Sequence, residues 1–118
     1  MRTDNVIDQR AVAFGVRIVK ACSFLQENKK EFVLSKQVLR SGTAIEAMVK
    51  ESEFAESKAD FVHKLSIALK EANETKYWLL LLHESEYLDD SSYESVNEDC
   101  LNLIRLLVSI IKRMKCAA

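Results

Sequence analysis

The basic side chains in the middle of the chain are the residues best suited to bind a ligand, because lysine and arginine pair with phosphate oxygens and carboxylates. Helical spacing places them on the outward sides of two consecutive helices. The candidate contacts for phosphates or for an acidic partner are Lys36, Arg40, Lys50, Lys64, Lys70 and Lys76. Glutamates are interleaved with them, as in Glu46 and Lys50, and Asp60 precedes Lys64 at the same spacing. The alternative is therefore a solvated face of compensating charges.

Histidine is the next residue type that could carry chemistry. His63 follows Asp60 by three positions, and bundles can build di-metal sites from two carboxylate-x-x-His pairs with two further inward carboxylates. His83 has no carboxylate three residues before it, and we expect it to form a hydrogen bond near the end of its helix. The sequence therefore predicts no metal site and no other cofactor.

Nucleophilic side chains are present, but the surroundings that activate them are not. The sequence has no glycine-rich turn to expose a nucleophile and no GxxxxGK[ST] motif to hold a phosphate. The cysteines Cys22, Cys100 and Cys116 are odd in number and lack paired spacing, which is typical of reduced thiols in a cytosolic protein. We therefore expect a protein without enzymatic activity.

Composition limits the fold to one class. The chain of 118 residues has no proline and two glycines, which favours an all-α domain over a sheet with many turns. Its 17 basic and 18 acidic residues give a net charge of -1, which is not typical of a dedicated nucleic-acid binder. With no signal peptide and no apolar run of about 18 residues, we expect a soluble, cytoplasmic protein that does not enter a membrane.

Apolar residues recur at helical spacing in four segments, over about 4–28, 32–54, 58–86 and 92–115. Ser57 is the predicted N-cap of the third helix, and Ser91 or Ser92 that of the fourth. The buried seam of the third helix is predicted to be Phe61, Leu65, Ala68, Ala72, Thr75 and Leu79. Because the connections are short, consecutive helices should be antiparallel neighbours. The sequence thus predicts one domain over 1–118, an all-α, antiparallel, up-down-up-down four-helix bundle.

Ser41, Gly42 and Thr43 could interrupt the second helix, because none of the three is a strong helix former. The apolar positions before and after them nevertheless stay in register, so the helix should continue. Gly42 then lies on the buried stripe, where the missing Cβ allows a neighbouring helix to approach closely. The hydroxyls of Ser41 and Thr43 can bond carbonyls one turn earlier.

The third and fourth helices carry more apolar residues than one core requires. In the fourth helix they spread over about 220° of arc, and "YWLLLL" at 77–82 covers every side of the third. Exposed, such surfaces would favour aggregation, so we expect a homo-oligomer that covers them. The candidate interface residues are Trp78, Leu81, Leu103, Leu106 and Ile110.

The segment 39–88 resembles the 23S rRNA intervening-sequence proteins, a family that also takes in accessory variability proteins of diversity-generating retroelements. The resemblance lies in Arg-Ser-x-Thr at 40–43 and in "KADFVHKLSIALKEANETKYWL" at 58–79. The resemblance implies a compact bundle that assembles into a pentameric ring. The retroelement members that the chain resembles bind nucleic acid together with a reverse transcriptase. Two functions follow: an oligomeric scaffold or adaptor acting through protein contacts, or a nucleic-acid-associated accessory protein acting through a charged oligomer surface.

Overall fold

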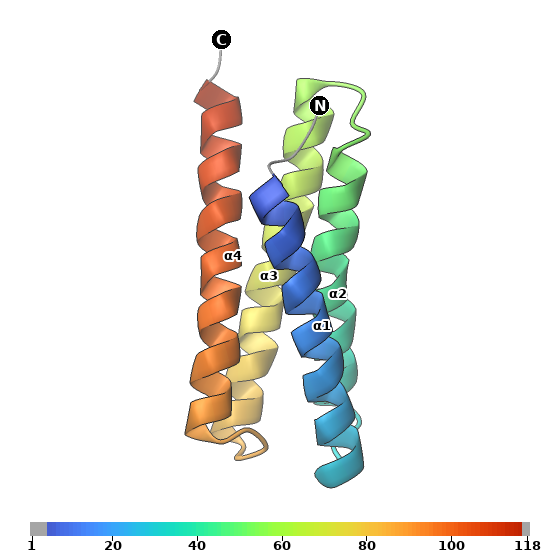
Figure 1. Ribbon diagram of the computed structural model, residues 1–118, viewed down its shortest axis with the longest axis vertical. Helices are drawn as coiled ribbons and strands as arrows, with labels where there is room; N and C mark the ends of the chain where they lie inside the picture. Colours follow the sequence, from blue (N-terminus) through green and yellow to red (C-terminus); the bar gives the residue numbers. More distant parts are fainter. Residues whose placement is uncertain (1–4, 117–118) are drawn as a thin grey trace.

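The computed structural model describes residues 5–116, which form four helices joined by short connections. The helices are α1 (Asn5–Asn28), α2 (Leu34–Ser52), α3 (Lys58–Glu84) and α4 (Asp90–Cys116). They run alternately in opposite directions, so α1 begins at the end of the bundle where α4 finishes (Figure 1). The all-α, up-down-up-down four-helix bundle predicted from the sequence is confirmed.

The core is a continuous apolar seam to which all four helices contribute. All six predicted seam residues of α3 are buried, which confirms the helical spacing of the third segment. The largest fully buried side chains on α1 are Phe14, Ile7, Ile18 and Leu25. None of the described helices has a stretch long and apolar enough to cross a bilayer.

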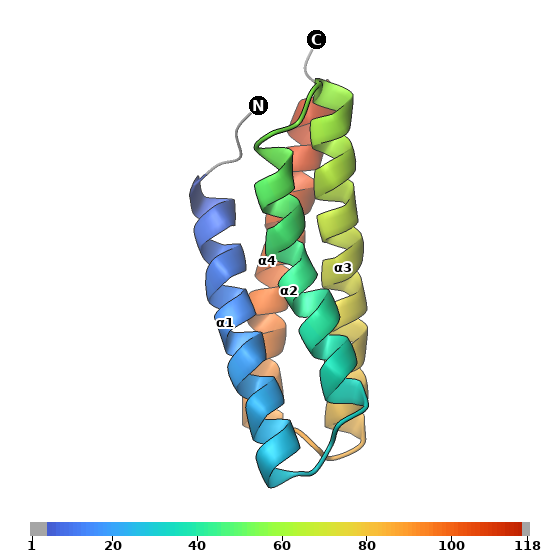
Figure 2. The same cartoon turned by 90° about the vertical axis from the view of Figure 1, so that its right-hand side faces the viewer.

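The four helices do not pack equally. The packing of α2 on α3 is the most extensive, and that of α1 on α4 the least. Within residues 5–116, the backbones of α1 and α3 do not approach each other closely, so these two helices occupy diagonal corners. Figure 2 shows α1 running beside α2. The flank of α1 towards α4 is therefore packed less tightly than the flank towards α2, and the outer face of α1 is exposed.

The start of α2 is fixed by a side chain that the sequence interpretation passed over. Glu31 is buried, and its Oε1 accepts the backbone N–H of Ser35 at 2.7 Å. Its Oε2 accepts the N–H groups of Leu34 at 3.1 Å and Val33 at 3.3 Å. These bonds satisfy donors that a helix start leaves unpaired. The helix consequently begins at Leu34, within two residues of the start predicted from the sequence.

Of the N-caps predicted for the last two helices, one is confirmed and the other is wrong. Ser57 caps α3 as predicted, since its side chain accepts the N–H of Asp60 at 3.0 Å. The prediction of Ser91 or Ser92 as the cap of α4 is wrong. Oδ1 of Asp89 accepts the N–H of Ser92 at 2.7 Å, and the helix begins at Asp90. A carboxylate is the stronger acceptor, so both serines lie inside the first turn.

The segment at Ser41–Thr43 lies inside a continuous α2. Gly42 is buried against α1, where an added Cβ would come 2.9 Å from Cγ2 of Ile18. The Thr43 hydroxyl donates to the Leu39 carbonyl at 2.7 Å, one turn earlier. Ser41 behaves differently, because its Oγ lies 2.7 Å from Oγ1 of Thr75 on α3 and 3.5 Å from the Val38 carbonyl. Its hydroxyl therefore joins two helices.

Candidate functional site

The residues that carry the family resemblance meet across the contact between α2 and α3. The guanidinium of Arg40 forms ion pairs with Glu71, at 3.2 Å, and with Glu74. Oε2 of Glu74 also accepts the indole N–H of Trp78 at 3.0 Å. Together with the buried hydroxyl pair, these bonds hold α2 to α3.

Three of the six candidate phosphate contacts are already paired with carboxylates. Besides Arg40, Lys50 places Nζ 2.9 Å from Oδ1 of Asp8. Lys64 places Nζ 3.3 Å from Oε1 of Glu51, and not beside Asp60 as the spacing had indicated. These three cations are therefore largely neutralised within the chain.

The other three candidate contacts are available to a partner. Lys36, Lys70 and Lys76 are exposed, and within residues 5–116 they form no ion pair. Lys36 lies on α2, and the other two lie on α3. Each is accessible, but together they supply only a small positive charge.

The predicted subunit interface on α3 and α4 needs correction. Leu103 is 1% exposed and Ile110 is 5% exposed, so both are core residues of the single chain and the prediction is wrong for them. Trp78, Leu81 and Leu106 are half-buried. Within the described residues, α4 leaves no large apolar side chain exposed. The large apolar side chains of α4 are buried or half-buried because the bundle packs against more than one side of this helix.

Exposed apolar side chains remain on α3, at Tyr77 and Leu80, and a line of them also lies on α1. Val12, Val16 and Val19, which we call the valine stripe, are 45%, 49% and 48% exposed. They recur at the i, i+4, i+7 spacing that places side chains on one face of a helix. The sequence showed this second line of residues beside the core line, but our interpretation used only the core line.

A shallow groove of about 410 Å³ runs between the valine stripe and α2. Its wall on α1 also includes Ala11, Gly15 and Lys20, and α2 contributes Thr43 and Glu46. A Cβ added to Gly15 would meet nothing within 4 Å. The α1 wall of the groove is therefore apolar except for Lys20, and it is open above Gly15.

A cluster of ionisable groups lies where the groove meets Glu46. Lys50 Nζ is 2.9 Å from Oδ1 of Asp8 and 3.8 Å from Oε1 of Glu46. Burial and the neighbouring Asp8 carboxyl raise the pKa of Glu46 to about 8. Hydrogen bonds from Lys50 and from Glu46 lower the pKa of Asp8. At neutral pH these opposite pKa shifts favour a protonated Glu46 beside an ionised Asp8.

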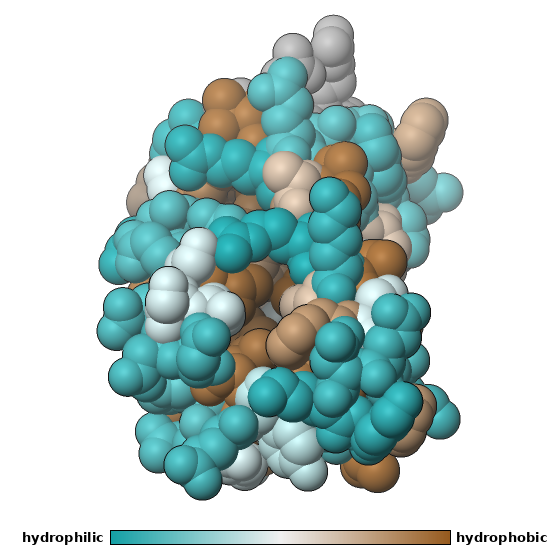
Figure 3. Space-filling model, turned by 60° about the horizontal axis from the view of Figure 1, so that its bottom comes forward, coloured by the Kyte–Doolittle hydropathy of each residue, from teal (hydrophilic) through white to brown (hydrophobic). Residues whose placement is uncertain are grey.

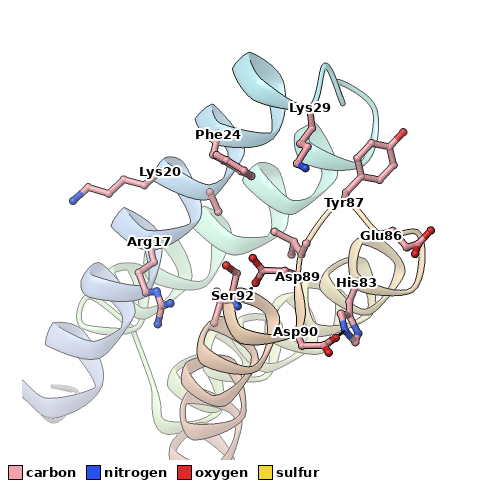
Figure 4. A pocket seen from close by; sticks show the side chains of 13 residues that line it. Arg17, Lys20, Phe24, Lys29, His83, Glu86, Tyr87, Asp89, Asp90 and Ser92 are labelled. Carbon is pink, nitrogen blue, oxygen red and sulfur yellow. Dashed lines mark hydrogen bonds and ion pairs between the residues drawn. The ribbon is translucent and has the colours of Figure 1, made fainter.

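A second hollow of about 710 Å³ opens near the end of the bundle where α1 finishes and α4 begins, between α1, α3 and the start of α4. Figure 3 shows its apolar floor, to which Ala21, Phe24, Leu88 and Val96 contribute. The charged side chains around this hollow are drawn in Figure 4.

Several of these charges are engaged within the chain. Arg17 Nη1 lies 2.7 Å from Oδ2 of Asp99. His83 Nε2 lies 2.7 Å from Oδ1 of Asp90, and its ring stacks on Tyr93 with centroids 4.2 Å apart. His83 thus forms the hydrogen bond expected near the helix end. The first pair joins α1 to α4 and the second joins α3 to the start of α4, so these four side chains are already engaged within the chain.

In the part of the chain that the structure describes, no group of three or more His, Cys, Asp or Glu side chains could hold a metal ion. Cys22 donates to the Ser35 carbonyl at 3.2 Å, and Cys100 to the Ala72 carbonyl at 3.4 Å. Burial raises the pKa of Cys22 to about 11 and that of Cys100 to about 12. Both therefore remain protonated, poorly nucleophilic thiols.

Comparisons with known proteins agree with this architecture. The family model described as 23S rRNA-intervening sequence protein matches residues 3–109. A crystal structure of a protein with unknown function from the S23 ribosomal protein family, from Bacteroides thetaiotaomicron, is 55% identical in sequence. The match covers 92% of this chain and 96% of that one, with a TM-score of 0.91. No curated protein matches the chain.

Proposed function

Because the chain belongs to the 23S rRNA-intervening sequence protein family, we propose that it acts as a non-enzymatic, homo-oligomeric helical scaffold. The solved relative is itself of unknown function, so family membership does not name a process. The observation that carries the proposal is the valine stripe on the outer face of α1. Cys22, Cys100 and Cys116 are free thiols, as is usual in the reducing cytoplasm, and we propose that the protein acts there.

Exposing the valine stripe to water is unfavourable in an isolated chain, whereas burying it against another subunit would stabilise an assembly. Burying apolar surface contributes about 25 cal/mol per Å², and these three valines form one continuous line rather than scattered points. Gly15 adds to the argument, because glycine inside a helix costs about 0.5–1 kcal/mol relative to alanine. No neighbour among the described residues requires a glycine at position 15, since its Cβ position is empty. A helix of another subunit could approach α1 closely there.

A different apolar surface lies on the diagonal corner of the bundle. Tyr77 and Leu80 on α3 are 52% and 41% exposed, and the half-buried Trp78 lies against Tyr77 with ring centroids 5.1 Å apart. Two unlike surfaces on opposite corners suit head-to-tail contacts, which generate a ring when the rotation closes. We propose that the valine stripe of one subunit meets this α3 surface of the next, in the pentamer implied by the family resemblance.

Light scattering coupled to size-exclusion chromatography tests the proposal. The wild type should elute as a multiple of the 13.5 kDa chain at micromolar concentration. Val16→Asp places a charge in the stripe and should shift the protein towards the monomer, because an unpaired carboxylate resists burial. Phe54→Asp is the matched control, since Phe54 is 83% exposed outside the helices and should leave the mass unchanged. A monomeric wild type would overturn the proposal.

The alternative is a nucleic-acid-associated protein that acts through a charged oligomer surface, with RNA or a reverse transcriptase as partner. The exposure of Lys36, Lys70 and Lys76 supports it, because repetition around an oligomer would multiply their charge. The internal pairing of Arg40, Lys50 and Lys64 and the net charge of -1 make it the less favoured function.

A further inference from the structure

Two carboxyl groups from different helices meet at the edge of the groove beside the valine stripe. Asp8 comes from α1, one turn before Val12, and Glu46 comes from the middle of α2. Lys50 is the cation between them, closer to Asp8 at 2.9 Å than to Glu46 at 3.8 Å. One lysine thus faces two acids.

The hydrogen bonding of Glu46 shows where a proton must lie. Both of its side-chain oxygens are buried, and neither accepts a hydrogen bond from any N–H or O–H group of the described residues. A buried carboxylate in that position would lack the partners that such a charge requires. The charged groups that act on it are Asp8 from α1, Lys50 from α2, and Glu53, which directly follows α2. A proton on Glu46 removes the conflict, because a protonated acid can donate to the neighbouring carboxylate of Asp8.

We propose that this shared proton is a latch between α1 and α2, and that its loss weakens the seating of a second copy on the valine stripe. The second part rests on the homo-oligomer proposed above. While Glu46 is neutral, the groove can be covered by apolar side chains at little cost. Once Glu46 is ionised, the same contact must bury a carboxylate or leave it beside Asp8 without enough positive charge.

Linkage makes this coupling reciprocal. A subunit that covers the groove removes water from Glu46 and so favours its protonated form further. The association constant should then stay level at neutral pH and fall by up to tenfold per pH unit, for each contact, above the pKa of about 8 in the free chain.

Sedimentation velocity between pH 6.5 and 9.5, at constant ionic strength, tests the inference with the full chain. The wild type should dissociate progressively above about pH 8, whereas Glu46→Gln, which stays neutral, should keep its association constant within about twofold. Asp8→Asn removes the charge that helps to hold the proton, so its dissociation should begin at lower pH. An identical pH response in wild type and Glu46→Gln would overturn the regulation.

A second measurement separates this inference from the proposed scaffold. A wild type that is monomeric even at pH 6.5 overturns the oligomer and the regulation of its contact, and urea unfolding then decides whether the latch exists. Because the folded chain raises the pKa of Glu46 from 4.5 to about 8, its unfolding constant should increase with pH between those values and level off above them. Relative to Glu46→Gln the increase should approach tenfold per pH unit, and equal pH profiles would refute the latch.

Discussion

Gly42 on α2 and Ile18 on α1 mark a point where the two helices come as close as their side chains allow. A Cβ added to Gly42 would lie 2.9 Å from Cγ2 and 3.0 Å from Cγ1 of Ile18, which is itself fully buried. The contact fixes α1 along α2 and thereby brings the valine stripe beside Thr43 and Glu46. The position of the candidate surface thus depends on one missing methyl group in the core.

Gly42→Leu should destabilise the fold by about 1–3 kcal/mol, because Ile18 is a branched, enclosed side chain that has no room to move. Gly15→Ala is the matched control. With open space at its Cβ, it should stabilise the monomeric fold by about 0.5–1 kcal/mol through helix propensity alone. Urea unfolding followed by circular dichroism measures both, and an unchanged stability in Gly42→Leu would contradict the packing role.

Ser41 and Thr75 should behave as an energetically coupled pair. Both are fully buried, with their hydroxyl oxygens 2.7 Å apart, and Thr75 also lies 2.8 Å from the Glu71 carbonyl. Ser41→Ala and Thr75→Val should each cost about 1–3 kcal/mol, since each leaves a buried hydroxyl short of a partner.

The double variant tests the coupling. It should cost less than the sum of the two single changes, with an interaction energy of about 0.5–3 kcal/mol in a double-mutant cycle. Thr43→Val is the control, because its exposed hydroxyl bonds only within α2 and its loss should change stability by less than about 0.5 kcal/mol. Strict additivity of Ser41→Ala and Thr75→Val would show that the hydroxyl pair contributes nothing of its own.

Glu31→Gln should destabilise the chain by about 1–2 kcal/mol at pH 7, because the carboxylate caps the start of α2 through three backbone N–H groups. Burial acts to raise the pKa of Glu31, but the N–H groups of Ser35, Leu34 and Val33 together outweigh it and hold the pKa below 4.5. This stabilisation is therefore present above about pH 4.5 and is lost as the pH falls through the lower, folded value.

Unfolding curves at pH 7 and pH 3 measure the effect of Glu31→Gln. The difference from wild type should shrink at the lower pH, because below about pH 4.5 the unfolded chain binds the proton that the folded Glu31 resists. Glu27→Gln changes an exposed acid in the last turn of α1 and should show neither the loss nor its pH dependence. A difference that is the same at both pH values would rule out the charged cap.

Much of the fold could be predicted because it depends on periodic burial. The six seam residues of α3 follow a single 3.6-residue period, and Gly42 stays in phase with the core positions around it, so local spacing was sufficient. Helix ends were harder to predict. Asp89 caps α4 in place of the predicted serines, and Glu31 caps α2. Only the path of the chain decides which acceptor reaches the free N–H groups.

The candidate surfaces were harder to predict because they depend on which helices touch. Leu103 and Ile110 looked surplus, but α4 packs more than one side of itself into the bundle and buries them. The valines of α1 lie outside its core line, beside the shallow groove between α1 and α2, and α2 does not cover them. The pairing of Asp8 with Glu46, 38 positions later, depends on the same contact between α1 and α2, and no local pattern indicates it.

Nucleic-acid binding is the property that separates the two functions most directly. If the chain is a scaffold, the fluorescence anisotropy of labelled structured RNA and of single-stranded DNA should stay flat at micromolar protein in low salt, where phosphate contacts are strongest. The alternative requires binding that weakens steeply with salt. It also requires that replacing Lys36, Lys70 and Lys76 with glutamine lowers the salt slope for single strands by about 2, at about 0.7 for each lost phosphate contact. Glutamine at the exposed Lys20, Lys29 and Lys112 is the charge-matched control. Equal loss in both triple variants would assign the binding to net charge alone, and salt-dependent binding lost only in the first would replace the scaffold with a nucleic-acid function.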